Sequence, residues 1–196
     1  KVYVEYPQGW LSNNLEADDN KQASWRTDPA QSGGSGCMGD IGTHAFNMAE
    51  FVTGSKVTHL CADLHTHIPG RRLDDDGAAF LKFDNNASGV LIASQVAAGE
   101  ENGLKIRVYG DKGGLEWFQM RPDSLIVRSL DKPMTILRGG QGQPGLCEEA
   151  LKRCRIPVGH PEGYLEAMGN LYTLFAQAIR SGQQGAADGV PGLAEG

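Results

Sequence analysis

Apolar and polar residues alternate along most of the chain between residues 56 and 137, and such alternation is typical of half-buried β-strands. Turn signals rich in Asp, Asn and Gly separate the runs. The runs follow one another too closely for crossover helices, so we expect a mostly antiparallel sheet. The expected strands are 1–6, 56–68, 78–83, 89–96, 104–109, 114–119, 124–130 and 134–137.

Two other stretches carry the apolar spacing of an amphipathic helix. In the first, Ile41, Ala45, Met48 and Val52 share one face, and Gly54 suits a C-terminal cap. The second is expected to begin near residue 161 and to end at residue 182. Its apolar face would consist of Tyr164, Met168, Leu171, Phe175 and Ile179. The polar, Gly-rich stretch 7–38 predicts a long loop with a short helix within residues 15–25.

These elements together predict an α+β fold, with a large mostly antiparallel β-sheet and helices packed on one face. The chain has 196 residues, which suits one domain over 1–196 with a hydrophobic core of its own. The other face of the sheet would then be free to meet a partner subunit.

Composition narrows the classes of function. The formal net charge is −6, which argues against a nucleic-acid or anionic-membrane surface. The apolar runs are too short for a transmembrane helix. The four cysteines show no CxxC pairing, so we expect free thiols in a reducing, cytoplasmic compartment, with a Cys147–Cys154 disulfide as the alternative.

The sharpest chemical signal is the pair Asp40 and His44. On a helix these positions share a face, and neither belongs to the apolar stripe, so both can face a cleft. A carboxylate beside an imidazole makes a workable proton donor or acceptor near neutral pH. The alternative is an acidic helix start followed by an exposed histidine.

The segment 34–39 (GSGCMG) matches the GxGxxG pattern of dinucleotide-binding loops. No strand precedes it and no acidic residue ends a strand at the required distance, so we do not assign it that role. A loop leading into a helix start still offers backbone N–H groups to a polar ligand. Trp25 and Arg26, just before this loop, could stack on a flat ligand.

Three other groups of residues invite a functional interpretation. His59, His65 and His67 would share one strand face with Asp63, which suggests either a metal site or a polar, interface or solvent-facing strand. The run of aspartates at 74–76 is typical of a solvated turn. His160, at a predicted helix start, would face either a cleft or solvent.

The motifs occur in the order found in one family of enzymes. The chain resembles the second domain of glucose–fructose oxidoreductase, inositol dehydrogenase and rhizopine-catabolism (Gfo/Idh/MocA) oxidoreductases. The matching segments are 25–29 (WRTDP), 33–39 (GGSGCMG), 39–44 (GDIGTH), 99–104 (GEENGL), 110–117 (GDKGGLEW), 159–164 (GHPEGY) and 170–172 (NLY). These segments are spread along the chain in the same order, so the resemblance runs over nearly the whole chain.

The resemblance implies an NAD- or NADP-dependent enzyme that moves hydride between nicotinamide and a sugar, cyclitol or related polyol. Asp40 and His44 match the family's D-x-x-x-H motif. His44 would be the general acid/base, and Asp40 would position the substrate or tune His44. Trp25 and Arg26 would lie near the nicotinamide, and His160 would line the substrate side.

The resemblance also implies an N-terminal Rossmann domain carrying an active-site Lys-Pro pair, whereas Lys132-Pro133 here falls in a strand turn. We therefore expect this chain to be a C-terminal substrate and oligomerisation domain that binds no cofactor and is inactive by itself. The alternatives are a non-enzymatic, sheet-mediated assembly module and a metal-dependent enzyme that uses His59, His65 and His67.

Overall fold

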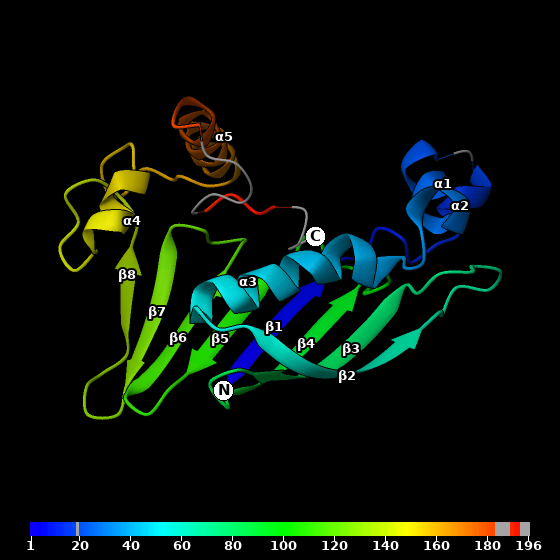
Figure 1. Cartoon of the computed structure of the whole chain (residues 1–196), viewed down its shortest axis with the longest axis horizontal. Helices are drawn as coiled ribbons and strands as arrows, with labels where there is room; N and C mark the ends of the chain where they lie inside the picture. The colour runs from blue at the N-terminus through cyan, green and yellow to red at the C-terminus, as the bar shows by residue number, and fades with distance from the viewer. Residues whose placement is uncertain (19, 183–188, 193–196) are drawn as a thin grey trace. The chain divides into compact units, whose positions relative to one another are not determined.

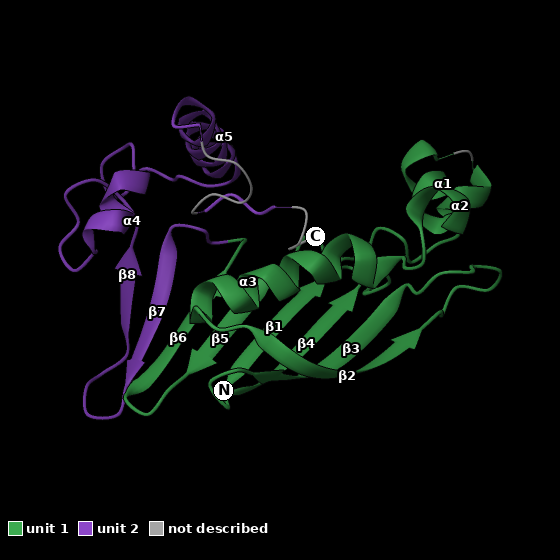
Figure 2. Cartoon of the chain, in the orientation of Figure 1, with its two compact units in different colours: residues 1–120 green, residues 121–196 purple. Residues whose placement is uncertain are grey.

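A computed structural model describes residues 1–18, 20–182 and 189–192 of the chain. The chain divides into two compact units, Lys1–Met120 and Arg121–Gly196 (Figure 2). The sequence predicted one domain over 1–196.

Unit 1 is built on six strands in the order β2-β3-β4-β1-β5-β6 (Figure 1). All its neighbouring strands whose register is resolved are antiparallel, except β1 and β4, which run parallel. The predicted α+β class with a large, mostly antiparallel sheet is therefore confirmed. The strands are β1 (Val2–Pro7), β2 (Val57–His65), β3 (Asp76–Phe83), β4 (Ser88–Ser94), β5 (Lys105–Tyr109) and β6 (Gly113–Phe118).

Because β1 and β4 run parallel, their C-terminal ends lie at the same end of the sheet. Val2 pairs with Gly89 and Pro7 with Ser94, so β1 and β4 end side by side. The segments that leave these two ends are joined as well, because the Gln8 N–H donates to the Ser94 carbonyl oxygen at 2.7 Å. The loops that follow these two strand ends supply side chains to the candidate functional site.

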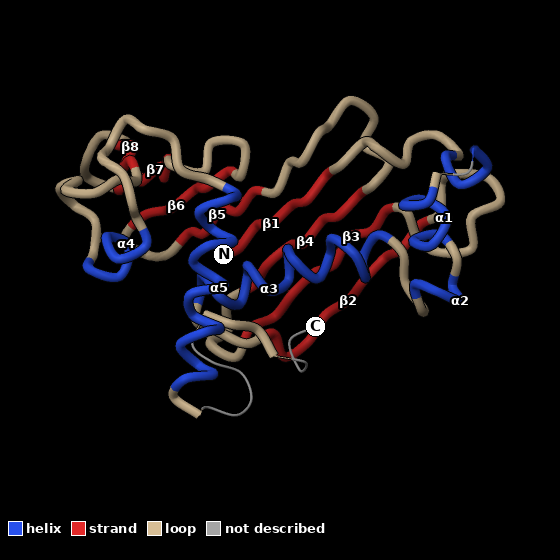
Figure 3. The backbone as a smooth tube through the Cα atoms, turned by 90° about the horizontal axis from the view of Figure 1, so that it is seen from above, coloured by secondary structure: helices blue, strands red, loops and turns tan. Residues whose placement is uncertain are grey.

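One helix covers the centre of the sheet (Figures 1 and 3). It consists of the π-helical turn η2 (Met38–Gly42) and α3 (Thr43–Thr53). Ile41 and Ala45 are buried, as predicted, and Gly54 adopts the left-handed cap. The main core residues are Val2, Val4, Tyr6, Ile41, Ala45, Ala49, Leu81, Leu91 and Ile106.

The prediction for Val52 is wrong. Its side chain is 45% exposed and that of Phe51 is 74% exposed. Ala49, which is fully buried, continues the apolar stripe instead. The last turn of α3 therefore presents apolar side chains that the core of unit 1 does not cover.

The stretch 7–38 is more ordered than its polar composition suggested. It contains η1 (Leu15–Asp18), α1 (Lys21–Thr27) and α2 (Pro29–Ser32). The Asn20 side chain caps α1 by accepting from two backbone N–H groups, and Asp28 caps α2 with Pro29 at the first helical position. Both starts follow ordinary capping rules.

The aspartate run at 74–76 is not a solvated turn. Asp75 is only 2% exposed and accepts hydrogen bonds from the backbone N–H groups of His67 and Ile68. Arg71, whose side chain is 2% exposed, lies 3.2 Å from Asp75 and 2.7 Å from Glu16. Partial burial alone would raise the pKa of Glu16, but the hydrogen bond and charge of Arg71 hold that pKa below its usual value.

The opposite face of the unit 1 sheet carries exposed apolar side chains. Phe80 is 70% exposed, Ile92 43% and Tyr3 36%. The registers place Phe80 opposite Val90 and Val90 opposite Tyr3, so these side chains share one face. On β5, Lys105 lies 3.8 Å from Glu5 and 3.5 Å from Glu116. We call this surface, defined by Tyr3, Phe80, Ile92 and Lys105, the open sheet face.

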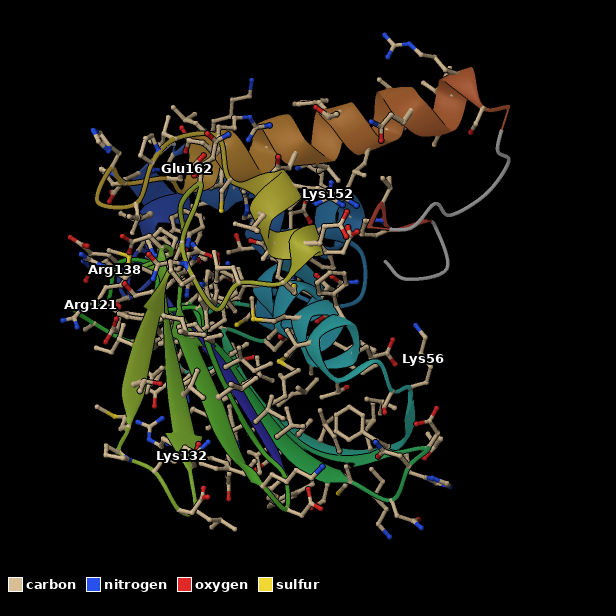
Figure 4. The ribbon with its side chains drawn as sticks, turned by 90° about the vertical axis from the view of Figure 1, so that its left-hand side faces the viewer. Lys56, Arg121, Lys132, Arg138, Lys152 and Glu162 are labelled. Carbon is tan, nitrogen blue, oxygen red and sulfur yellow. The ribbon has the colours of Figure 1, made fainter. Side chains whose placement is uncertain are left out.

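Unit 2 contains a β-hairpin of β7 (Ser124–Ser129) and β8 (Thr135–Arg138), followed by α4 (Glu148–Arg153) and α5 (Tyr164–Arg180). Lys132 lies in the turn between the two strands, as predicted, and Arg138 ends β8 (Figure 4). The sequence predicted α5 and missed α4. In α5, Tyr164 is 74% exposed, Phe175 52% and Ile179 63%, so much of its predicted apolar face is uncovered.

Among the described residues, no helix is both long enough and apolar enough to cross a lipid bilayer.

Candidate functional site

The π-helical turn η2 carries Asp40, and His44 follows in the first turn of α3. The start of this helix lies over the C-terminal ends of β1 and β4 (Figure 1). Wide helical turns of this kind are frequent at functional sites because they change the direction in which a side chain projects. Asp40 and His44 therefore project near the C-terminal ends of β1 and β4, where several loops meet.

Asp74 holds the loop that leads into this turn. Its Oδ1 accepts from the Ser35 hydroxyl at 2.9 Å and from the Gly36 N–H at 2.8 Å. Its Oδ2 accepts from the Met38 N–H at 2.7 Å. The Gly39 N–H donates to Ser35 Oγ at 2.9 Å. These backbone donors are therefore occupied, and the expectation that they face a polar ligand is wrong.

Asp40 is fixed by two donors that converge on one carboxylate oxygen. Arg26 Nε lies 2.9 Å from Asp40 Oδ2, and Gln95 Nε2 lies 2.8 Å from the same atom. The Asp40 side chain remains 29% exposed. Among the described residues no hydrogen bond or ion pair joins Asp40 to His44. The two side chains therefore present separate polar groups.

Aromatic rings surround the Arg26 guanidinium. Its central carbon lies 4.1 Å from the centre of the Trp25 ring and 5.7 Å from that of Trp10. One nitrogen also donates to Gln22 Oε1 at 2.6 Å. Cation–π contacts and hydrogen bonds together restrict the guanidinium to one orientation. Arg26 thus binds Asp40, and the rings of Trp25 and Trp10 lie against Arg26. The sequence did not reveal that Trp10 belongs to this group.

His44 is exposed, and its nearest aromatic neighbour is Tyr6 of β1, with ring centres 6.2 Å apart. The Tyr6 hydroxyl donates to Asn102 Oδ1 at 2.8 Å, and Gln8 Nε2 donates to the same oxygen at 2.7 Å. Burial raises the pKa of Tyr6, with a smaller contribution from the charge of Asp40, against hydrogen bonds that lower it. Tyr6 therefore stays neutral beside His44 at physiological pH.

The remaining predicted residues belong to other elements of the chain. His160 belongs to unit 2, where its Nδ1 is 3.2 Å from the Pro157 carbonyl oxygen, so its place on the substrate side stays a prediction. On β2, His65 Nε2 lies 3.0 Å from Asp63 Oδ2, and the His65 ring stacks on that of His67. Within the described residues, no group of three or more His, Cys, Asp or Glu could hold a metal ion. The metal interpretation of these histidines is therefore not supported.

The order of these features matches a known family. The family described as the GFO/IDH/MocA C-terminal domain matches residues 1–116. The chain belongs to this family. Its match includes every side chain of the Asp40 and His44 site.

Two curated relatives are similar over much of the chain. An uncharacterized oxidoreductase, YfiI, of Bacillus subtilis is 30% identical over 181 residues, which are 91% of this chain and 45% of that protein. A levoglucosan dehydrogenase of Pseudarthrobacter phenanthrenivorans is 30% identical over 145 residues, which are 62% of this chain and 35% of that protein. The chain thus spans less than half the length of these relatives.

Solved structures of oxidoreductases have a similar fold. An inositol dehydrogenase homolog from Azotobacter vinelandii, complexed with NAD⁺, superposes with a TM-score of 0.85 at 33% identity, over 92% of this chain and 47% of that one. A levoglucosan dehydrogenase in complex with NADH and levoglucosan superposes with a TM-score of 0.79 at 26% identity, over 93% of this chain and 49% of that one.

Proposed function

We propose that this chain is the substrate-binding and oligomerisation part of an NAD- or NADP-dependent oxidoreductase acting on a sugar, cyclitol or related polyol. The observation that carries the proposal is the Asp40 carboxylate, clamped through one oxygen beside an exposed His44. Relatives of the same family are solved with NADH and myo-inositol or with NADH and levoglucosan, which supports a polyhydroxy substrate.

In this proposal His44 exchanges a proton with the reacting oxygen of the substrate. Oxidation of an alcohol requires a base to remove the hydroxyl proton, and reduction of the carbonyl requires an acid to return it. An exposed imidazole can serve both directions near neutral pH. Asp40 Oδ2 is already occupied by two donors, so Oδ1 is the oxygen that accepts from a substrate hydroxyl. Asp40 and His44 would thus hold two different oxygens of one polyol.

The nicotinamide cofactor would supply or accept the hydride. Trp25 offers a partly exposed aromatic ring that packs on the Arg26 guanidinium, the kind of flat surface that could pack against a nicotinamide. Arg26 would hold the edge of that surface, because its guanidinium is already engaged by Asp40 and Gln22. We assign most of the cofactor site to a Rossmann domain outside this chain and expect the chain alone to bind no cofactor. His160 would line the substrate side.

We also propose that the open sheet face joins copies of this chain. Exposed Phe80, Ile92 and Tyr3 form the apolar part of this face, and Lys105, which bridges Glu5 and Glu116, forms its charged part. Apolar side chains gathered on one face, bordered by charges, are typical of a protein–protein interface. The alternative function is a non-enzymatic assembly module that uses the same face.

We further propose that the protein is cytoplasmic, because its four cysteines are free thiols.

The test is an assay of the full gene product that contains this chain. We expect it to reduce NAD⁺ or NADP⁺ with at least one of myo-inositol, glucose and levoglucosan. We also expect this chain alone, at the same concentration, to produce no NADH or NADPH. Light scattering on the same samples reports the assembly state. A stable oligomer without turnover on any polyol would favour the assembly module and contradict the enzyme.

A further inference from the structure

Gln95 follows β4, and it is one of the few polar residues buried in unit 1, with 2% of its surface exposed. Its backbone is held on both sides. The N–H donates to the Asp75 carbonyl oxygen at 2.9 Å, and the carbonyl oxygen accepts from the Leu11 N–H at 3.0 Å. Asp75 is itself fixed by the buried Arg71. Gln95 is therefore buried and held at its backbone from both sides.

The buried side-chain amide of Gln95 forms a hydrogen bond with Asp40. Its Nε2 donates to Asp40 Oδ2 at 2.8 Å, across 55 positions of sequence. The second donor, Arg26, comes from a seven-residue helix, and its side chain is 24% exposed. Gln95 is the more completely buried of the two donors, so solvent competes less for its hydrogen bond to Oδ2.

We propose that Gln95 is a positioning residue that holds Asp40 so that Oδ1 faces the substrate. A carboxylate has two oxygens, and saturating one of them with two fixed donors leaves the other for a hydroxyl. This inference rests on the proposed function for its effect on turnover, whereas its effect on the Asp40 side chain does not depend on that function.

The principal variants are Gln95→Leu and Gln95→Glu, assayed in the full gene product with a polyol and nicotinamide cofactor. Gln95→Leu keeps the volume and removes the donor. We expect kcat/KM to fall between about 10-fold and about 100-fold, the range that a displaced catalytic group produces. The control is Ser55→Ala, which removes another buried polar side chain (8% exposed) that contacts Asn85 rather than Asp40. We expect that control to leave kcat/KM unchanged.

Gln95→Glu gives a signature that a purely structural role would not produce. At high pH it places a second carboxylate against Asp40, and like charges at this distance repel. As the pH falls, the carboxyl pair takes up one proton, and the protonated group can again donate to Asp40. Activity relative to the unsubstituted protein should therefore recover as the pH is lowered from about 8 to about 5, whereas Gln95→Leu should show no recovery.

The other groups around Asp40 do not produce this recovery. Arg26 is unchanged in both proteins. Burial raises the pKa of both Tyr6 and Cys37, so neither ionises in this range. His44, on the same helix, is present in both proteins.

Two outcomes would overturn the proposal. One is unchanged kcat/KM in Gln95→Leu with an unchanged melting temperature. The other is a Gln95→Glu defect that does not depend on pH.

If the gene product turns over no polyol, the proposed function fails. A crystal structure of Gln95→Leu then tests the positioning role of Gln95 independently of turnover. Displacement of the Asp40 carboxylate from Arg26 would support the positioning role, and an unmoved carboxylate would contradict it.

Discussion

Replacing His44 with alanine is expected to lower the turnover of the full gene product by about 10²-fold to 10⁴-fold, the usual contribution of general acid–base catalysis. In the proposed function, the exposed His44 ring is the group that exchanges a proton with the reacting oxygen. Its exposure also means that the truncation should change the free energy of unfolding by no more than about 0.5 kcal/mol. The measurement is kcat with saturating polyol and cofactor, together with a melting curve.

His59→Ala is the matched control for this prediction. His59 is also an exposed histidine, and its Nδ1 contacts only the neighbouring Thr58 hydroxyl in the described structure. We expect His59→Ala to retain full turnover. Near-normal turnover in His44→Ala would remove His44 from the mechanism, even if the protein proves to be an oxidoreductase.

The largest effect on stability is expected for Asp75→Ala, at about 3–5 kcal/mol in the free energy of unfolding. The substitution leaves the buried Arg71 guanidinium without its nearest buried partner and two backbone N–H groups without an acceptor. Arg71 would keep only Glu16 as a carboxylate partner, and the two N–H donors in the interior would keep the cost of desolvation without its compensation. Urea unfolding followed by tryptophan fluorescence measures the change.

Asp63→Ala is the control here. The Asp63 side chain is 80% exposed and pairs with an exposed His65, and such surface pairs contribute about 1 kcal/mol or less. Equal urea midpoints for Asp75→Ala and Asp63→Ala would show that the Arg71–Asp75 pair does not stabilise unit 1. That result would also weaken the argument that Gln95 is rigidly anchored, because its backbone is bonded to Asp75.

The strands were predictable because alternation is a local signal. Each predicted strand lies within a few residues of an observed one, and β3 differs only at its start, which is Asp76 rather than residue 78. The place of β1 between β4 and β5 could not be predicted, since pairing partners far apart in sequence leave no trace in alternation. The parallel pairing of β1 with β4, which brings their C-terminal ends together at the site, follows from that placement.

The site was predictable only in part, for a similar reason. Asp40 and His44 stand four positions apart, and Trp25 and Arg26 are neighbours, so local spacing drew attention to all four. Gln95 contacts Asp40 across 55 positions, and nothing near Gln95 in the sequence marks that contact. The aspartates at 74 and 75 were misinterpreted because an acidic run is usually solvated, whereas here their carboxylates bind backbone N–H groups.

The most direct test of the account is a crystal structure of the full gene product with a polyol and a nicotinamide cofactor bound. We expect one substrate hydroxyl within hydrogen-bond distance of a ring nitrogen of His44, and a second hydroxyl on Asp40 Oδ1. Gln95 and Arg26 should remain on Oδ2. A polyol bound away from both Asp40 and His44 would contradict the central claim that these two side chains hold the reacting substrate.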